Sequence, residues 1–241
     1  MSKKDIIEQL KDGLIVSCQA VEDEPHYMEG ITVKFAECAA WAGAAGIRAD
    51  TPEDVRAIKE KVDLPVIGIW KIKRNINDVY LTPNLEAAKA LWDAGAEIIA
   101  VQATNHLRED GKKSYETIKE IKKHIPEALI FADVATAEDA KIAAEYGADF
   151  VAPTLAGYTK AGYFDKIQIK DAPDYILLKD VIEAVKGSES KVIMEGKVAT
   201  PEIAVQCLYM GAYAVVVGNA ITRPHITAKR FARAMNRYQD E

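Results

Sequence analysis

The feature that most constrains the fold of this chain is a repeated unit: a short apolar run, a turn, and a segment with helical periodicity. The clearest copy spans residues 191–222. Its two apolar runs, 192–194 and 214–217, each end at a glycine turn, and a helix-period segment over 201–210 joins them. Thr200 can cap that helix, and Pro201 suits its first position. The unit predicts strand, helix and parallel strand.

The same unit recurs along the whole chain. The expected strands cover residues 13–18, 46–48, 65–70, 97–101, 128–133, 149–152, 192–194 and 214–217. The expected helices cover residues 31–45, 51–61, 82–94, 114–124, 136–146, 175–185, 201–210 and 227–238.

Strict alternation of eight strands with eight helices over 241 residues predicts an α/β protein with a closed (β/α)8 barrel, the TIM barrel. We expect one domain over residues 1–241, with a short helix at about 3–11 closing or flanking the bottom of the barrel. A doubly wound open sheet is the rival fold. It is disfavoured because the first strand lacks a G-x-G-x-x-G turn and no Walker A sequence occurs.

Composition and charge exclude several classes of function. A net charge of −6 argues against a nucleic-acid surface. The longest uncharged apolar run, 38–47, is about half of the ~20 residues that a membrane span needs. Three cysteines without a C-x-x-C motif suggest no disulfide framework and fit a reducing cytoplasm. The four histidines lie away from the expected strand ends, so no metal site is predicted.

In a parallel barrel, the residues that follow each strand meet at one rim. The predicted rim consists of Gln19, Arg48, Lys71, Gln102, Asp133, Thr154, Glu195 and Gly218. One lysine, one arginine and two carboxylates therefore converge there without a histidine.

Two of these residues can move protons. Desolvation and nearby cations would favour a neutral Lys71 amine that acts as a base. The alternative for Lys71 is a side chain that extends into water. Glu195 follows an apolar strand, and an apolar setting raises the pKa of a carboxyl group. A structural salt bridge from Glu195 to Lys71 or Arg48 is the alternative.

The glycine turns after the last two strands suggest a phosphate site, because free backbone N–H groups bind anions. Gly196, Lys197, Gly218 and Asn219 would form it. The alternative is that these glycines only turn the chain.

Seven segments, in order along the chain, carry a resemblance to one family. They are GLIVSCQA, GIRAD, PVIGIWK, FADVAT, DFVAPTLAGYT, VIMEGKVATPEIA and GAYAVVVGNAITRP. Together they resemble the successive motifs of the N-acetylmannosamine-6-phosphate 2-epimerases of sialic-acid catabolism, from about residue 10 to 235. The resemblance implies a barrel that interconverts N-acetylmannosamine 6-phosphate and N-acetylglucosamine 6-phosphate without a redox cofactor.

The resemblance also implies roles for individual positions. Lys71 matches the catalytic lysine, and Glu195 matches the glutamate of the E-G-R turn. Gln19, Arg48 and Asp133 match substrate-binding positions of the family. Gln102 and Thr154 are expected to bind substrate because they follow predicted strands. The expected phosphate-binding residues are Gly196, Lys197, Gly218, Asn219 and Arg223.

The sequence departs from the family pattern at three places. The run after the third strand has two lysines, so Lys73 becomes the counterpart of the catalytic lysine if the register slips. Gln102 stands where the family has aspartate, and Lys197 stands for the arginine of E-G-R.

Two other functions stay open at this point. A lysine beside an aldehyde also describes a Schiff-base aldolase, and the departures are compatible with a phosphosugar-binding barrel without turnover. The segment 157–173 is expected to close over the sugar. A homodimer is a possible assembly.

Overall fold

The structure is a computed structural model that describes residues 1–72, 79–157 and 172–239, with side chains to residue 236. Within these ranges, eight strands pair in parallel with their neighbours in sequence, and the last pairs with the first. The strands are β1 (Leu14–Cys18), β2 (Gly46–Asp50), β3 (Val66–Ile69), β4 (Ile98–Gln102), β5 (Leu129–Asp133), β6 (Phe150–Ala152), β7 (Lys191–Glu195) and β8 (Ala214–Val217). The predicted closed barrel is confirmed.

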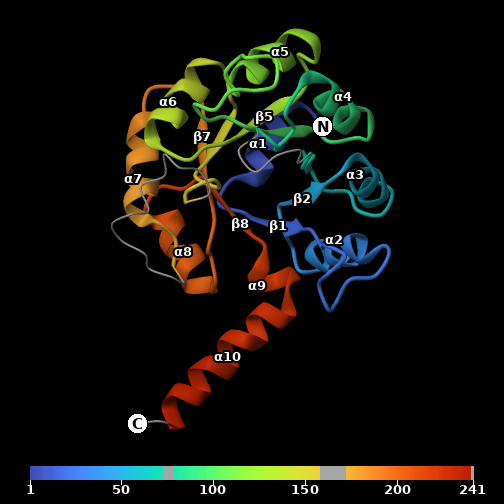
Figure 1. Cartoon of the computed structure of the whole chain (residues 1–241), viewed down its shortest axis with the longest axis vertical. Helices are drawn as coiled ribbons and strands as arrows, with labels where there is room; N and C mark the ends of the chain where they lie inside the picture. Colours follow the sequence, from blue (N-terminus) through green and yellow to red (C-terminus); the bar gives the residue numbers. More distant parts are fainter. Residues whose placement is uncertain (73–78, 158–171, 240–241) are drawn as a thin grey trace.

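Helices between the strands form the outer layer (Figure 1). They are α2 (Ile31–Trp41), α3 (Pro52–Lys59), α4 (Leu85–Asp93), α5 (Glu116–His124), α6 (Ala137–Glu145), α7 (Tyr175–Ala184) and α8 (Pro201–Tyr209). Their buried faces and the outward faces of the strands form one apolar layer of mainly Val, Ile, Leu and Ala side chains.

Side-chain caps start most of these helices. Thr51, Asn84, Thr136, Asp174 and Thr200 each accept a hydrogen bond from the N–H three residues later. Such a bond satisfies an N–H that the helix leaves unpaired.

The predicted start of the helix over 114–124, with Ser114 as its cap, is wrong. The Ser114 hydroxyl donates to the carbonyl of Thr104 at 2.7 Å and accepts its N–H at 2.8 Å. Ser114 therefore closes the loop between β4 and α5, and the helix begins two residues later, at Glu116.

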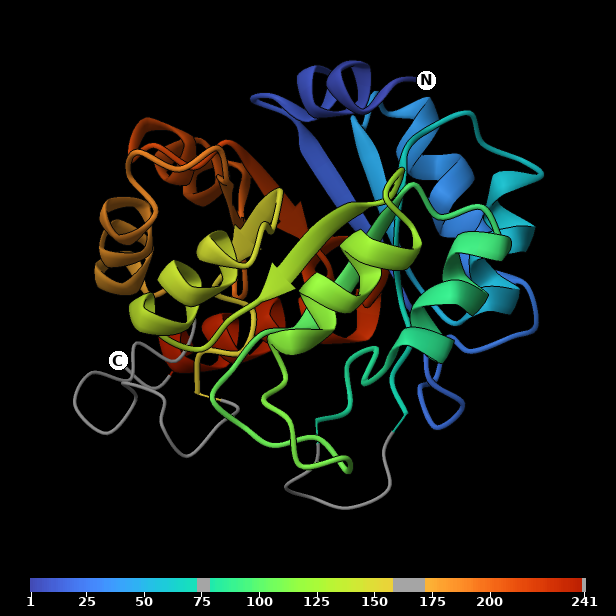
Figure 2. The ribbon, with the colours of Figure 1, turned by 90° about the horizontal axis from the view of Figure 1, so that it is seen from above.

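The helix α1 (Lys3–Leu10) covers the bottom of the barrel. Its Ile6 and Leu10 are buried against inward-facing strand residues such as Ile15 and Ile67. Figure 2 shows α1 at the top, whereas the loop between β4 and α5 lies at the opposite end. The lower end of the barrel is thus sealed, and the site must open at the end where the strands finish.

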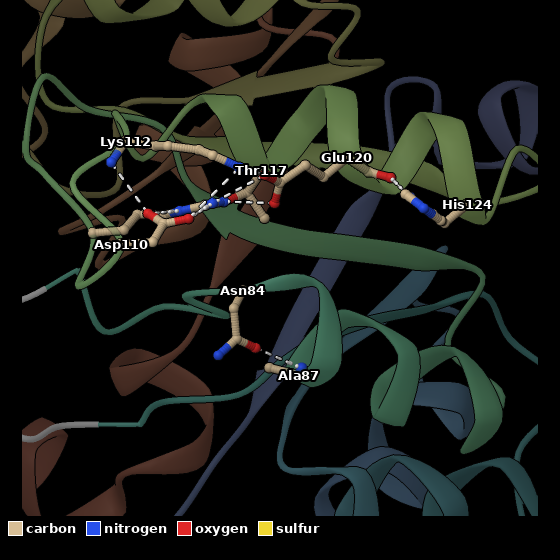
Figure 3. Close-up of polar contacts among 8 residues, drawn as sticks. Asn84, Ala87, Asp110, Lys112, Thr117, Glu120 and His124 are labelled. Carbon is tan, nitrogen blue, oxygen red and sulfur yellow. Dashed lines mark hydrogen bonds and ion pairs between the residues drawn. The ribbon is translucent and has the colours of Figure 1, made fainter.

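Arg108 fastens the loop between β4 and α5. Its guanidinium, almost fully buried, donates to Thr117 at 2.7 Å, to both Glu120 oxygens at 2.8 and 3.0 Å, and to Asp110. Lys112 reaches Glu120 at 2.8 Å as well (Figure 3). This network is the main polar tie between that loop and its helix.

The chain after β8 forms the short helix α9 (Asn219–Thr222) and then α10 (Pro224–Gln239). Figure 1 shows α10 extending away from the barrel instead of packing along it. All its side chains from 231 to 236 are exposed, including Phe231 at 68% and Met235 at 65%. In the described part of the chain, no helix combines the length and apolarity needed to cross a membrane.

Candidate active site

A cavity of about 560 Å³ opens where the strands end. Ten of the predicted site residues line it: Gln19, Arg48, Lys71, Thr154, Glu195, Gly196, Lys197, Gly218, Asn219 and Arg223. A shallower groove of about 610 Å³ lies over α4 and α5, and its charges belong largely to the Arg108 network. Because strand ends converge only at the first cavity, we take it as the candidate active site.

Arg48 is the central charge of this site. It projects from β2, is 2% exposed, and forms a two-pronged pair with Asp133 of β5, with its Nη2 at 2.8 Å and 3.0 Å from the two oxygens. The same guanidinium donates to Glu195 of β7. The guanidinium carbon lies 4.9 Å from the centre of the Phe131 ring. One buried cation therefore holds two carboxyl groups.

Glu195 has an acid–base character that suits proton transfer. Burial raises the pKa of Glu195 to about 7, with the neighbouring Asp133 adding to the rise and Arg48 opposing it. Its side chain keeps 15% exposure and faces the cavity. Both the acid and the base form of Glu195 are therefore populated near neutral pH.

Lys71 stands just past β3, and its surroundings differ from those predicted. The expected desolvation is wrong, because the side chain is 36% exposed and its ammonium lies 3.2 Å from the carboxylate of Asp50. The ammonium also donates to the Gln19 amide oxygen, while the Gln19 amide nitrogen donates to Ser17 at 2.9 Å. Lys71 thus reaches the cavity as one member of a polar cluster. Lys73, the alternative, lies outside the described residues.

Two predicted substrate-binding residues do not line the cavity. Gln102 is 3% exposed, accepts the N–H of Tyr80 at 3.2 Å and donates to Thr104 at 3.2 Å. Asp133 is fully buried against Arg48. These two side chains support the wall and the central arginine. Thr154 lines the cavity, and its hydroxyl has no hydrogen-bond partner among the described residues.

The part of the cavity lining that follows β7 and β8 collects cations and turns. Gly196 and Lys197 both have positive φ, 115° and 55°, so the chain turns sharply there. Arg223 donates to Asn219 at 2.5 Å and pairs with Glu24. This wall has the backbone turns and positive charge of an anion site.

Three residues of the site were not predicted from the sequence. Asp50 was not predicted because the expected strand ended at Arg48, whereas β2 continues to Asp50. Arg230 comes from α10, donates to the Ala199 carbonyl at 3.0 Å and lines the cavity. Tyr80 lines it from the segment before α4. The alternation of strand side chains, which puts residues 48 and 50 on one face, was the available signal for Asp50. In the described ranges, no group of three His, Cys, Asp or Glu side chains is placed to hold a metal ion.

A family model described as "Putative N-acetylmannosamine-6-phosphate epimerase" matches residues 32–237. The chain belongs to this family. The match includes all the strands except β1, so it covers most of the barrel together with the Arg48, Lys71 and Glu195 positions.

Relatives in the epimerase family align over nearly their full length. An N-acetylmannosamine-6-phosphate 2-epimerase of Listeria welshimeri is 42% identical, covering 95% of each chain. The corresponding protein of Staphylococcus aureus is 44% identical, covering 94% of this chain and 99% of its own. Both relatives are described as "Putative N-acetylmannosamine-6-phosphate 2-epimerase".

A solved structure supports the same assignment. The N-acetylmannosamine-6-phosphate 2-epimerase of Clostridium perfringens is 35% identical, with a TM-score of 0.85 over 95% of this chain and 96% of that chain. A solved aldolase matches with a TM-score of 0.61 at 18% identity, which is a likeness of fold alone. The family is therefore set by sequence and structure together.

Proposed function

We propose that this protein is an isomerase that interconverts N-acetylmannosamine 6-phosphate and N-acetylglucosamine 6-phosphate, a step in the use of amino sugars from sialic acid. The observation that carries the proposal is the family match over residues 32–237. The amine of Lys71 and the carboxyl of Glu195, which line the same cavity from β3 and β7, support it chemically.

The reaction inverts C2 of the open-chain sugar. The C1 aldehyde acidifies the C2 proton, so a base can remove it to give an enolate, and a proton returned to the other face gives the epimer. Lys71 and Glu195 serve as the two proton-transferring groups. Lys71 takes the proton from one epimer and Glu195 takes it from the other, so their roles exchange with the direction of the reaction.

The enolate oxygen requires fixed hydrogen-bond donors. Gln19 and the Lys71 ammonium are suitable, because each lines the cavity and they contact each other. Arg48 was expected to serve as a donor too. Its contacts with Asp133 and Glu195 favour a different role, in which it holds the Glu195 carboxyl in place.

The sugar phosphate is assigned to the wall formed by Gly196, Lys197, Gly218, Asn219 and Arg223. A Cβ added at Gly218 would lie at an ordinary contact distance of 3.4 Å from Ser17 Cβ, so a side chain here would pack beside β1 at the cavity. A bare backbone there allows phosphate oxygens to approach the N–H groups closely. Thr154, which follows the neighbouring strand β6, contacts the sugar. The expected lid, residues 157–173, falls almost wholly outside the described residues.

The test is an NMR spectrum of the protein incubated with N-acetylmannosamine 6-phosphate. Appearance of the glucosamine epimer supports the proposal, and an unchanged spectrum with bound sugar would leave only a binding protein. An aldolase would instead break a carbon–carbon bond, and borohydride would trap the sugar on Lys71.

We infer that the protein is a homodimer that works in the cytoplasm. A helix of 16 residues is marginally stable alone, yet α10 has no buried side chain from residue 231 to 236. Val205 and Tyr209, one turn apart on α8, are also exposed, at 49% and 88%. A second copy would cover both apolar faces. Three free cysteines and a phosphorylated substrate fit the cytoplasm.

A further inference from the structure

Asp50 holds Lys71 at two points. Its Oδ1 accepts the backbone N–H of Lys71 at 3.1 Å, and its Oδ2 lies 3.2 Å from the Lys71 ammonium. The same Oδ1 accepts the N–H of Thr51 at 3.0 Å. One carboxylate thus fixes both the start and the tip of the lysine side chain.

The backbone around Asp50 is arranged to make these contacts. Asp50 is the last residue of β2 and lies opposite Ile69, the last residue of β3. Thr51 follows with a φ of 67°, a left-handed value that a β-branched residue seldom adopts. The Thr51 N–H bonds to Asp50 and to the Ile69 carbonyl, at 2.9 Å, maintain this conformation. Strained residues of this kind concentrate at functional sites.

We propose that Asp50 is a positioning residue that aims the Lys71 ammonium into the cavity beside Gln19. The inference rests on the proposed function and adds to it a residue that neither the family resemblance nor the strand-end pattern identified. A lysine side chain has four flexible carbons and loses much rotamer freedom when fixed. A carboxylate that holds both its ends offsets that loss before substrate arrives.

Asp50 also directs the Lys71 ammonium for the proton transfer. Two-group epimerisation requires one group to begin protonated and the other deprotonated. Asp50 keeps the Lys71 ammonium directed at the cavity, where it can donate a proton when Glu195 is the acceptor. The other charged groups near this pair are Arg48 and Glu195 in the site and Asp54 in the first turn of α3.

The first test compares Asp50→Asn with Asp63→Asn. Asparagine retains an oxygen for both backbone N–H groups but loses the charge that faces Lys71, whereas Asp63 is an exposed acid outside the cavity. We expect kcat of Asp50→Asn to fall about 10- to 100-fold with KM changed less than about threefold. Asp50→Glu should recover part of kcat. The proposal would be overturned if a folded Asp50→Asn variant had the kcat of the parent protein, whether KM was unchanged or raised.

The second test does not depend on turnover. Acetic anhydride modifies neutral amines, and mass spectrometry gives the rate at Lys71 relative to exposed Lys61 in the same chain. Asp50→Asn should raise that ratio about 3- to 10-fold at pH 8, since the amine is no longer held against a carboxylate. An unchanged ratio would contradict the positioning role. A raised ratio in a protein that does not epimerise the sugar would uphold Asp50 and refute the proposed function.

A third measurement needs no variant, in case Asp50→Asn fails to fold. Raising NaCl from about 0.05 M to about 1 M screens a partly exposed ion pair. The acetylation ratio of Lys71 to Lys61 in the unsubstituted protein should then rise. A ratio that stays constant across this range would show that Asp50 does not act on the ammonium.

Discussion

At the scale of single residues, one guanidinium controls the charge of the site. Arg48 contacts both Asp133 and Glu195. One positive charge cannot neutralise two buried carboxylates, so the pKa of one of the two acids is raised. Asp133 has the two-pronged contact and no exposure, whereas Glu195 faces the cavity. Glu195 is consequently the acid that exchanges protons near pH 7.

The pH dependence of turnover follows from this arrangement. Burial and Asp133 raise the pKa of Glu195 to about 7. Below that pH the carboxyl is protonated and cannot accept the C2 proton, so kcat/KM should fall about tenfold per pH unit on the acid side. Asp133→Asn removes a charge that raises this pKa, and the inflection should move to lower pH.

Steady-state kinetics between pH 5.5 and 8.5 provides the measurement. Glu202→Gln, at an exposed acid in the first turn of α8, should keep the parent inflection. A profile without an inflection near pH 7, or one that Asp133→Asn leaves in place, would remove Glu195 from the proton transfer.

Lys71 and Lys73 are separated by substitution. Lys71 lines the cavity and contacts Gln19, so Lys71→Ala should slow exchange of the C2 proton by about 10² to 10⁴. Lys73→Ala should mainly weaken binding. NMR detection of the C2 proton in D2O measures both. Rapid exchange by Lys71→Ala together with loss in Lys73→Ala would reverse the assignment.

At the scale of elements, the Arg108 network stabilises the loop between β4 and α5. Arg108→Ala would leave Asp110 and Glu120 without their shared buried partner, and we expect a loss of about 1–3 kcal/mol in the free energy of unfolding. Lys186→Ala removes a cation from an exposed pair with Glu183 and should cost less than about 0.5 kcal/mol. Urea unfolding compares the two, and equal losses would contradict the network's role.

The free energy that the Arg108 network contributes to folding should decrease at low pH. The hydrogen bond from Arg108 lowers the pKa of Asp110 to about 2, and Glu120 shifts in the same direction. Groups with lowered pKa stabilise the fold above their ordinary values, and that stabilisation disappears as pH falls through the lowered ones. The difference between parent and Arg108→Ala should therefore shrink from about pH 4 to about pH 2.

Element boundaries explain which parts of the site could be predicted. Hydrophobic periodicity located every strand, and strand ends placed Gln19, Lys71 and Glu195 correctly on the cavity. The end of β2 was predicted two residues early because Arg48 and Asp50 interrupt the apolar pattern. In a sequence, a polar residue that interrupts an apolar run is interpreted as the end of the strand. The partner that allows it to be buried, such as Asp133 for Arg48, is brought close only by the fold.

The predicted role of Gln102 shows a second limit. Its place at the end of β4 was predicted correctly, yet its amide bonds to Tyr80 and Thr104. Loop backbones decide whether a rim side chain faces the cavity or the wall, and their course has no periodic signal in the sequence. The same reason concealed Arg230, which reaches the cavity from α10.

At the scale of the whole molecule, α10 runs from the cavity to an exposed apolar surface. Its N-terminal half lines the cavity through Ile226 and Arg230, and its C-terminal half bears exposed Phe231 and Met235. We expect light scattering to give about 53 kDa, twice the chain mass of 26.5 kDa. Phe231→Asp should shift this toward the monomer by placing charge in the apolar contact, and Asn236→Asp, on another face, should not. A monomeric parent would contradict the dimer.

The barrel as a whole brings together a phosphate wall and a proton-transferring pair, and the central claim is that the proton at C2 is exchanged there. The most direct measurement is incubation with N-acetylmannosamine 6-phosphate in D2O, followed by proton NMR and mass spectrometry. The account predicts N-acetylglucosamine 6-phosphate carrying one deuterium, at C2. An epimer that retains its original C2 hydrogen, or a sugar recovered without epimerisation or deuterium, would contradict it.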